Sequence, residues 1–201
     1  MEKRERIATV GRPRAFDPDK ALEAAMRVFQ KKGYEGASLS DLTEAMGINR
    51  PSLYATFGNK EELFRKAFDR YAAGPAALGR CALEMPTARG AVEALLYGAA
   101  STLANPDHPG CLSVVGALTC SAEGEAIRKE LCARRAMGQE ALRERFERAR
   151  TEGDLPSQAD PTTLARYIST VMQGMSVQAA GGATAEELRS VVDTALKAWP
   201  I

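Results

Sequence analysis

Apolar residues recur every three or four positions along most of this chain, the spacing that places them on one face of an α-helix. The first such stripe predicts a helix that begins at Asp17 and Pro18 and ends just before Gly33. Its apolar face contains Ala21, Leu22, Ala25, Val28 and Phe29. No stretch alternates apolar and polar residues as a half-buried strand does. The pattern therefore predicts an all-α fold.

The C-terminal two thirds of the chain repeats this pattern. A long helix is predicted from Asn59 into the seventies, with Gly74 and Pro75 marking its end or a kink. Further helices are predicted over 88–104, 112–121, 125–151, 160–180 and 184–199. Several of these segments are bounded by an N-cap residue, a following Gly or a Pro.

The segment 38–64 has the most informative punctuation. Ser38 and Asp41 have a spacing close to that of a capping box, and Gly47 suits the left-handed end of a short helix. Asn49 and Pro51 then open a second short helix, whose inward positions are Leu53 and Phe57. Two short helices joined by a tight turn are typical of a helix-turn-helix DNA-binding unit, although a helical hairpin in a bundle has a similar pattern.

The second of these short helices needs its neighbours. About seven residues do not form a stable helix alone in water, so the flanking helices must hold it. Its outward positions are small or polar: Arg50, Ser52, Ala55 and Thr56. Such a helix fits a major groove about 12 Å wide. Double-stranded DNA is therefore the predicted partner.

These residues resemble the TetR-type (TetR/AcrR) helix-turn-helix transcriptional regulators. The resemblance is strong from Gly11 to about Tyr71. It depends on F-x-x-x-G-Y at 29–34, on residues 38–48, on L-Y-x-x-F at 53–57 and on N-K-E-E-L-F at 59–64. Beyond this segment the resemblance is limited to the helical pattern and a G-C-L run at 110–112.

The resemblance implies a set of DNA-binding residues. Tyr54 and Lys60 match positions that contact phosphates, and Ser38 and Ser40 match backbone- and base-contacting positions. Ala55 and Thr56 depart from the family, where aromatic residues and histidine are frequent, so base preference does not transfer from relatives. The predicted set is Arg12, Arg14, Ser38, Ser40, Arg50, Pro51, Ser52, Tyr54, Ala55, Thr56 and Lys60.

Three regions are predicted: a basic arm (1–15), a helix-turn-helix domain (16–66) and a helical effector-binding and dimerisation domain (67–201). The arm contains GRPR at 11–14, where Pro favours an extended backbone. Such an arm can follow phosphates or enter a minor groove, although each arginine is equally consistent with a solvated tail.

The last two helices carry apolar seams that need a partner. In one chain they could pack on each other, but a DNA-binding protein with one short recognition helix gains affinity by two-fold pairing on a palindrome. The resemblance implies a four-helix homodimer interface. The predicted interface residues are Leu164, Ile168, Val171, Met172, Met175, Leu188, Val191, Val192, Ala195 and Leu196.

The middle helices are rich in Ala, Leu and Val and are suited to enclosing an apolar cavity. The resemblance implies a small-molecule effector that releases a repressor from a palindromic operator. The predicted pocket contains Leu95, Leu96, Ala99, Leu103, Cys111, Val114 and Leu118, although plain core packing is the alternative for each.

Two alternative functions remain open. Cys111 follows Pro109 and Gly110 near a helix start, where amide dipoles favour a thiolate, so it could serve a redox- or electrophile-sensing regulator. A buried small hydrophobe is the simpler interpretation of the same residue. The other alternative is a ligand-binding protein that has lost DNA binding, and the intact polar face of the second short helix argues against it.

Composition narrows the functional classes. The 201 residues have a net charge of +1, but residues 1–66 hold 13 Lys and Arg against 10 Asp and Glu. One histidine excludes a His-rich metal site, and no glycine-rich phosphate loop or GxSxG motif occurs, so we predict no enzyme, no metal and no cofactor. No apolar run is long enough to span a membrane. A cytoplasmic protein with reduced cysteines is expected.

Overall fold

The computed structural model describes residues 16–107, 110–118 and 124–200. These residues form helices and contain no strand, so the all-α prediction is confirmed. The helices are α1 (Pro18–Gly36), α2 (Leu39–Met46), α3 (Arg50–Phe57), α4 (Lys60–Leu83), α5 (Ala88–Leu103), α6 (Leu112–Leu118), α7 (Glu125–Glu152), α8 (Pro161–Ala180) and α9 (Ala185–Lys197).

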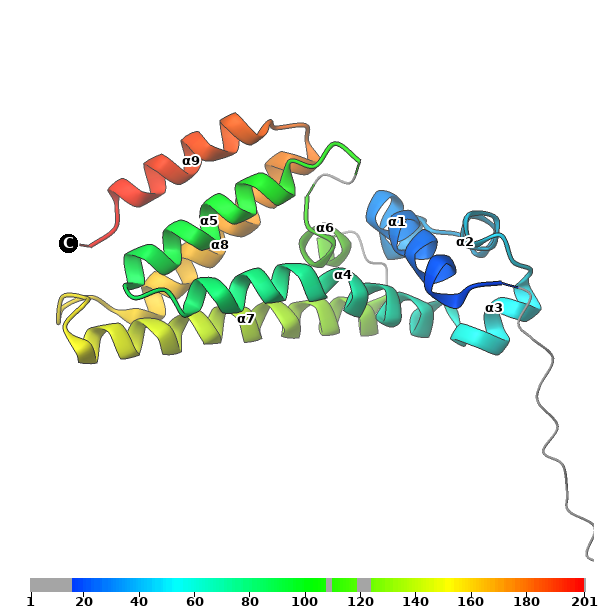
Figure 1. The fold of residues 1–201 in the computed structure, drawn as a ribbon, viewed down its shortest axis with the longest axis horizontal. Helices are drawn as coiled ribbons and strands as arrows, with labels where there is room; N and C mark the ends of the chain where they lie inside the picture. The colour runs from blue at the N-terminus through cyan, green and yellow to red at the C-terminus, as the bar shows by residue number, and fades with distance from the viewer. Residues whose placement is uncertain (1–15, 108–109, 119–123, 201) are drawn as a thin grey trace, which may run out of the picture.

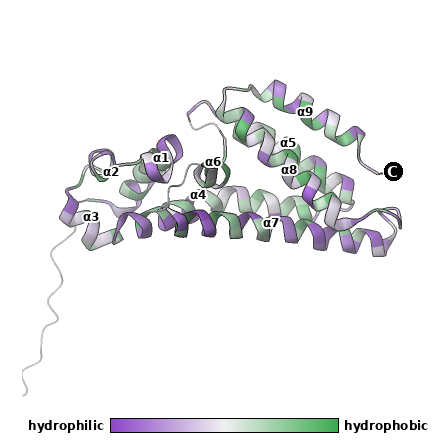
Figure 2. Ribbon diagram, turned by 180° about the vertical axis from the view of Figure 1, so that it is seen from behind, coloured by the Kyte–Doolittle hydropathy of each residue, from purple (hydrophilic) through white to green (hydrophobic). Residues whose placement is uncertain are grey.

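The long helices α4 and α7 run lengthwise through the molecule (Figure 1). Helices α1–α3 gather at one end, and α5, α8 and α9 lie at the other end. Figure 2 shows α7 as largely hydrophilic along its length. More hydrophobic segments lie in α5 and α8. No helix in the described part of the chain is long and apolar enough to cross a membrane.

The N-terminal core joins α1–α4 and contains a cluster of aromatic rings. Phe29 and Tyr34 both meet the ring of Phe64 edge-on, with ring centroids 5.0 Å and 5.2 Å apart. Residues from α6 and α7, including Leu112 and Ile127, are buried in the same cluster. The predicted boundary after residue 66 therefore falls inside the continuous helix α4, and the N-terminal core extends across it.

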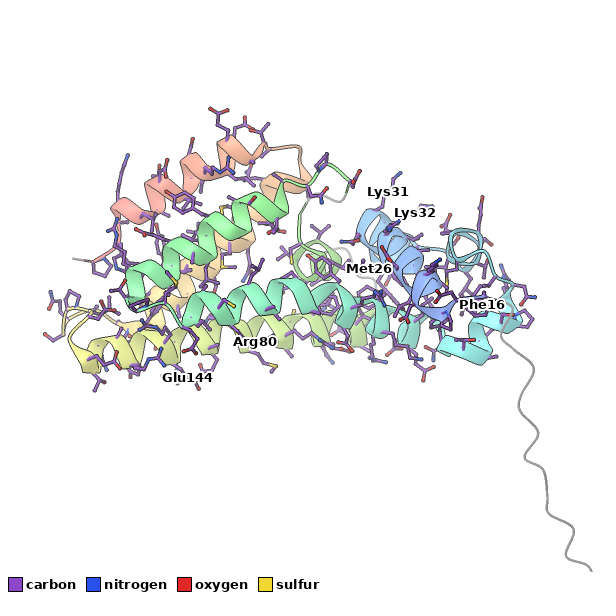
Figure 3. The ribbon with its side chains drawn as sticks, in the orientation of Figure 1. Phe16, Met26, Lys31, Lys32, Arg80 and Glu144 are labelled. Carbon is purple, nitrogen blue, oxygen red and sulfur yellow. The ribbon has the colours of Figure 1, made fainter. Side chains whose placement is uncertain are left out.

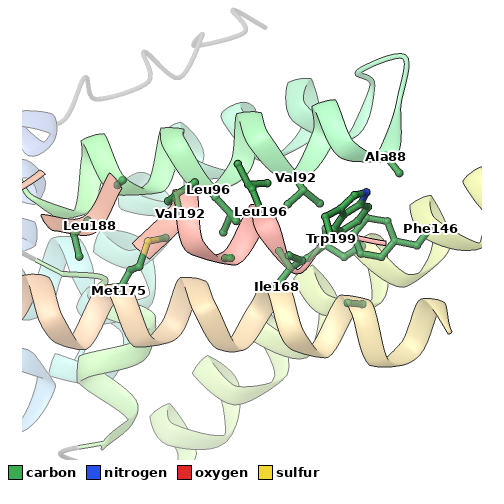
Figure 4. Close-up of a cluster of buried hydrophobic side chains, with 14 of the residues drawn as sticks. Ala88, Val92, Leu96, Phe146, Ile168, Met175, Leu188, Val192, Leu196 and Trp199 are labelled. Atoms are coloured by element: carbon green, nitrogen blue, oxygen red, sulfur yellow. The ribbon is translucent and has the colours of Figure 1, made fainter. Parts of the chain in front are cut away.

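The C-terminal core joins α5, α7, α8 and α9. Figure 4 shows side chains from these helices gathered in one elongated cluster, with Trp199 at one end beside Phe146, whose ring lies 5.4 Å away. Six residues predicted for the dimer interface are buried in this core of the chain itself. They are Ile168, Met175, Leu188, Val192, Ala195 and Leu196. Packing within one chain, the alternative that the sequence left open, accounts for these six.

Of the two outcomes predicted at Gly74 and Pro75, a helix end or a kink, the helix end is wrong. Gly74 and Pro75 do not end α4, which continues to Leu83. The continuation is stabilised at its far end, because Arg145 of α7 donates from Nε to the Leu83 carbonyl (3.1 Å) and from Nη2 to the Met85 carbonyl (3.0 Å). Arg145 is only 5% exposed. A long-range contact thus offsets the helix-breaking tendency of Pro.

Gly33 behaves as predicted. Its φ of 68° and ψ of −179° are not helical and interrupt α1 before Tyr34. The side chains of Asp160 and Thr184 cap the starts of α8 and α9, and Gly153 ends α7 with a left-handed backbone.

Candidate nucleic-acid interface

Local hydrogen bonds fix the positions of α2 and α3. Ser38 Oγ accepts from the Asp41 N–H (3.0 Å), and the Asp41 carboxylate accepts from the Ser38 N–H (3.0 Å). Gly47 then takes a left-handed φ of 64°. Asn49 Oδ1 accepts from the Ser52 N–H (2.9 Å) and caps α3. The predicted helix-turn-helix is therefore present, with each boundary held by the residue that the sequence indicated.

The inner side of α3 is anchored in the N-terminal core. Leu53 is fully buried, and Phe57 is 4% exposed. Phe16 packs against Phe57, with ring centroids 6.4 Å apart, and Figure 3 shows Phe16 close to α3. Lys66 Nζ of α4 donates to the Phe57 carbonyl (3.0 Å) at the end of α3. This short helix is thus held by its neighbours, as its length requires.

The outer side of α3 carries the predicted DNA-binding residues. Arg50, Pro51, Tyr54 and Ala55 are exposed, whereas Ser52 and Thr56 are half-buried. Tyr54 is 49% exposed, a large fraction for an aromatic side chain. This surface faces away from the core, and we call it the α3 outer face.

Residues of α2 and α4 extend this surface. Ser38, the N-cap of α2, and Ser40 are exposed, and Arg50 Nη2 donates to Ser40 Oγ (3.1 Å). Lys60, at the start of α4, places its ammonium 4.5 Å from the centre of the Tyr34 ring. Nine predicted residues therefore belong to α2, α3 and the start of α4. Arg12 and Arg14 lie outside the described residues.

One ion pair at this surface was missed. Lys32 Nζ of α1 donates to Asp41 Oδ1 (2.6 Å). This contact, together with the Ser38 hydroxyl and N–H, lowers the pKa of the Asp41 carboxyl from 3.8 to about 2. Figure 3 shows Lys31 and Lys32 near the C-terminal end of α1. The capping role of Asp41 was visible in the sequence, but nothing in the spacing pointed to Lys32.

The described residues predicted to line a ligand pocket are buried or half-buried in the fold. Leu96, Leu103 and Val114 are buried, and Leu95, Ala99 and Cys111 are half-buried. The side chain of Leu118 lies outside what the structure describes. Among the members of the predicted set whose side chains are described, Cys111 alone borders the hollow of about 180 Å³ between α1 and α6, whose other walls include Gln30, Lys31 and Gly116.

The surroundings of Cys111 are polar. Its backbone N–H donates to Ser176 Oγ of α8 (2.7 Å), and its Sγ lies 3.0 Å from Ser113 Oγ. Burial and the neighbouring thiol raise the pKa of the Tyr71 hydroxyl. Within the described residues, no group of three or more His, Cys, Asp and Glu side chains is arranged to hold a metal ion.

A shallow groove remains on the outer surface of α8 and α9. It is lined by Tyr167, Val171, Ser190, Val191, Thr194 and Ala195. Val191 is 43% exposed, and Leu164, Val171 and Met172 are half-buried. Val191, Leu164, Val171 and Met172 are the predicted dimer residues that the chain itself does not bury fully, although the last three pack against its C-terminal core.

Comparison with known proteins places this geometry in a family. Residues 21–67 match the family described as bacterial regulatory proteins, tetR family. The chain superposes with a TM-score of 0.90 on a cysteine mutant of the TetR family transcriptional regulator CifR complexed with 26-bp double-strand operator DNA. The two are 46% identical over 94% of this chain and 100% of that one. This chain belongs to the TetR family.

Relatives of known sequence agree with this TetR-family assignment. The HTH-type transcriptional repressor ComR of Escherichia coli K12 is 37% identical over 94% of this chain and 92% of its own length. The repressor BdcR of the same organism is 30% identical over 89% and 86%. The predicted family and the predicted class of transcriptional regulator are confirmed. The two alternatives, a Cys111-based sensor and a ligand-binding protein without DNA binding, gain no support from these names.

Proposed function

We propose that this TetR-family chain is a sequence-specific DNA-binding transcriptional repressor. The observation that carries the proposal is the α3 outer face, which is exposed while Leu53 and Phe57 anchor the other side of the same helix. A relative that is 46% identical is described in complex with operator DNA. The second helix of a helix-turn-helix enters the major groove, so α3 is the proposed recognition helix.

The roles that we propose follow from side-chain chemistry. Tyr54 and Lys60 contact phosphates, and Arg50 reads a base edge, because a guanidinium pairs well with the two acceptors of guanine. Pro51, Ser52, Ala55 and Thr56 complete the surface that enters the groove, and Ser38 and Ser40 flank it. Arg12 and Arg14 belong to the proposed arm, where positive charge favours the DNA backbone.

We further propose a homodimer that pairs through α8 and α9. The groove on these helices presents Val171 and Val191, while the nearby hydroxyls are satisfied inside the chain. Ser190 Oγ donates to the Glu186 carbonyl (3.2 Å), and Thr194 Oγ1 donates to the Ser190 carbonyl (2.9 Å). A second copy would thus cover this surface without leaving those donors unpaired.

An effector-binding domain (67–201) is the third part of the proposal. Because α4 begins directly after α3 and runs from the DNA-binding region into the C-terminal body, a ligand that shifts the body would shift α3. We propose a small-molecule effector among the middle helices, near Leu95, Ala99 and Cys111. A ligand that fits one spacing of the two DNA-binding units better would change operator affinity about 5–150-fold, the usual range of coupling.

Selection of bound DNA from a random pool tests the main proposal. The expected product is a palindrome whose half-sites lie one helical turn, about 34–36 Å, apart. Screening small molecules for release of the selected DNA then tests the effector. Recovery of no enriched sequence by the full chain, at low salt and high protein concentration, would exclude sequence-specific binding.

A further inference from the structure

The side chains of Ser40 and Arg50 meet across the turn of the helix-turn-helix. Ser40 is the second residue of α2, and Arg50 is the first residue of α3. The Arg50 Nη2 atom donates to Ser40 Oγ over 3.1 Å. Both side chains are exposed, so the hydrogen bond lies at the surface that the proposed function assigns to DNA.

Both residues stand on backbone that is already fixed. The capping box of Ser38 and Asp41 closes the turn in which Ser40 lies, and Thr43 Oγ1 donates to the Ser40 carbonyl (3.1 Å). The Asn49 cap fixes the start of α3 at Arg50. The mobile part of the pair is therefore the long Arg50 side chain itself, and the Ser40 hydroxyl limits where its guanidinium lies.

The chemistry of the pair suits a reading residue. A guanidinium has five N–H donors, and this hydrogen bond engages one of its nitrogens, so further donors remain for a base edge. A serine hydroxyl is neutral, so the positive charge of Arg50 stays available to the DNA. The first turn of α3 contains no acidic residue that would compete for it. A fixed guanidinium also loses less rotamer freedom on binding.

We propose that Ser40 is a positioning residue that fixes the Arg50 guanidinium for base reading, an inference that rests on the proposed DNA-binding function. Ser40 then contributes to base preference through Arg50. The alternative role, in which Ser40 contacts the DNA directly and independently of Arg50, makes a different prediction in a double-mutant cycle.

The test compares five full-length proteins: the wild type, Ser40→Ala, Ser40→Thr, Arg50→Ala and the double variant Ser40→Ala/Arg50→Ala. Dissociation constants are measured at one salt concentration on the selected operator and on operators changed at single half-site positions. Thermal unfolding confirms that each variant is folded. Alanine and threonine are both compatible with a helix, and Thr keeps the hydroxyl, so Ser40→Thr is the matched control.

Coupling between the two positions is the expected result. Ser40→Ala should lower discrimination about threefold to tenfold at the base position that also responds to Arg50→Ala, the size expected for one hydrogen bond. Ser40→Thr should retain most of the discrimination. In the Arg50→Ala background, Ser40→Ala should change nothing further.

Two results would overturn this inference while leaving the proposed function intact. One is an equal loss from Ser40→Ala with and without Arg50, which would mean that Ser40 acts on the DNA by itself. The other is an equal loss on every operator variant, which would mean that Ser40 affects only general affinity. A wild-type protein that selects no operator would instead overturn the proposed function, and this inference with it.

Discussion

At the scale of single residues, Lys60 tests the proposed phosphate contacts. Its ammonium lies over the Tyr34 ring, 4.5 Å from the centroid, and so has a defined position at the start of α4. Lys60→Ala should weaken binding to cognate and scrambled DNA alike. It should also reduce the slope of log affinity against log salt by about one, because each neutralised phosphate releases counterions.

Lys197→Ala is the matched control for this prediction. Lys197 is exposed on the last turn of α9, at the opposite end of the molecule from α3 (Figure 1). Its removal changes the net charge equally but should leave the salt slope unchanged. An altered base preference in Lys60→Ala would contradict a phosphate role. Titrations at several salt concentrations distinguish these outcomes.

Asp41 gives a pH-dependence prediction. Lys32 and Ser38 lower the pKa of its carboxyl to about 2 in the folded chain, from an ordinary value of 3.8. The ionised form is therefore favoured by folding, so its stabilising effect is complete above about pH 4 and is lost as pH falls toward 2. Asp41→Asn should be less stable than wild type at pH 6, and the difference should shrink between pH 4 and pH 2.

Urea unfolding followed by circular dichroism at several pH values measures this difference. The Lys32→Met variant provides a second comparison, since it removes the first-named partner and keeps the carboxylate. In this variant the pKa of the Asp41 carboxyl should lie closer to its ordinary value of 3.8. The stability that the carboxylate contributes should therefore be lost at a higher pH than in the wild type. If the free energies of unfolding of the wild type and Asp41→Asn ran parallel from pH 6 to pH 2, the ion pair would contribute nothing to folding stability.

Residue roles were predictable from the sequence only where the partner is near along the chain. The bonds of Ser38 with Asp41, and of Asn49 with Ser52, span three residues and follow from helix-capping rules. The Lys32–Asp41 pair spans nine residues and depends on how α1 packs against α2. Tyr34 was visible in a motif, but its position beneath Lys60 requires the folded arrangement.

At the scale of elements, two glycines that end short helices differ in their surroundings. Gly47 has a φ of 64° with open space around an added Cβ. Gly58 has a φ of 82°, and an added Cβ would lie 1.8 Å from Glu62 Oε2. That oxygen accepts from the Asn59 N–H (2.9 Å) and completes the cap of α4. Gly58→Ala should therefore destabilise by about 1–2 kcal/mol more than Gly47→Ala.

Gly74→Ala provides the control for these substitutions. Gly74 lies inside α4 with nothing within 4 Å of an added Cβ, so Ala should stabilise by up to about 1 kcal/mol. Chemical denaturation of the three variants gives the comparison. Equal costs for Gly47→Ala and Gly58→Ala would show that Glu62 moves aside without loss of its cap.

Arg145 connects two elements and gives a second prediction at this scale. Arg145→Met keeps an unbranched apolar stem but removes the guanidinium that donates to the carbonyls of Leu83 and Met85. Leaving these acceptors unpaired should cost about 2–4 kcal/mol of unfolding free energy. Arg148→Met is the control, because Arg148 is exposed and its contact with Leu83 is longer, at 3.4 Å. It should cost about 0.5 kcal/mol or less. Similar losses in both variants would contradict the role of Arg145.

Element boundaries were predictable where a cap is local, and α4 shows where this fails. Gly74 and Pro75 are poor helix formers, and the sequence-based expectation followed that preference. The helix continues because its last turn packs in the folded chain, with Ala82 buried and the Leu83 carbonyl held by Arg145 from 62 residues away. Local propensity contains no information about that contact.

At the scale of the whole molecule, periodicity identified the apolar faces but not what covers them. The stripe on α9 contains Leu188, Val192 and Leu196, which pack against α5 and α8 of the same chain (Figure 4). Val191, one position from Val192, is 43% exposed. Neighbouring positions of α9 therefore belong to the core and to the surface. The sequence pattern alone could not show which apolar residues of α9 are buried in the chain and which are exposed.

That division gives the last prediction, which concerns assembly. In a two-fold dimer through α8 and α9, Val191 occurs twice, so Val191→Glu would bury two unpaired carboxylates. The dissociation constant of the dimer should rise about 100-fold or more, while the exposed position leaves the fold of each chain intact. Sedimentation velocity over a range of protein concentrations measures the dimer, and circular dichroism monitors the fold.

Met137→Glu is the control, because Met137 is 72% exposed on α7, outside the proposed interface. Operator affinity should fall together with dimerisation in Val191→Glu, since two half-sites need two copies of α3. A Val191→Glu protein that stays dimeric would place the interface on another surface.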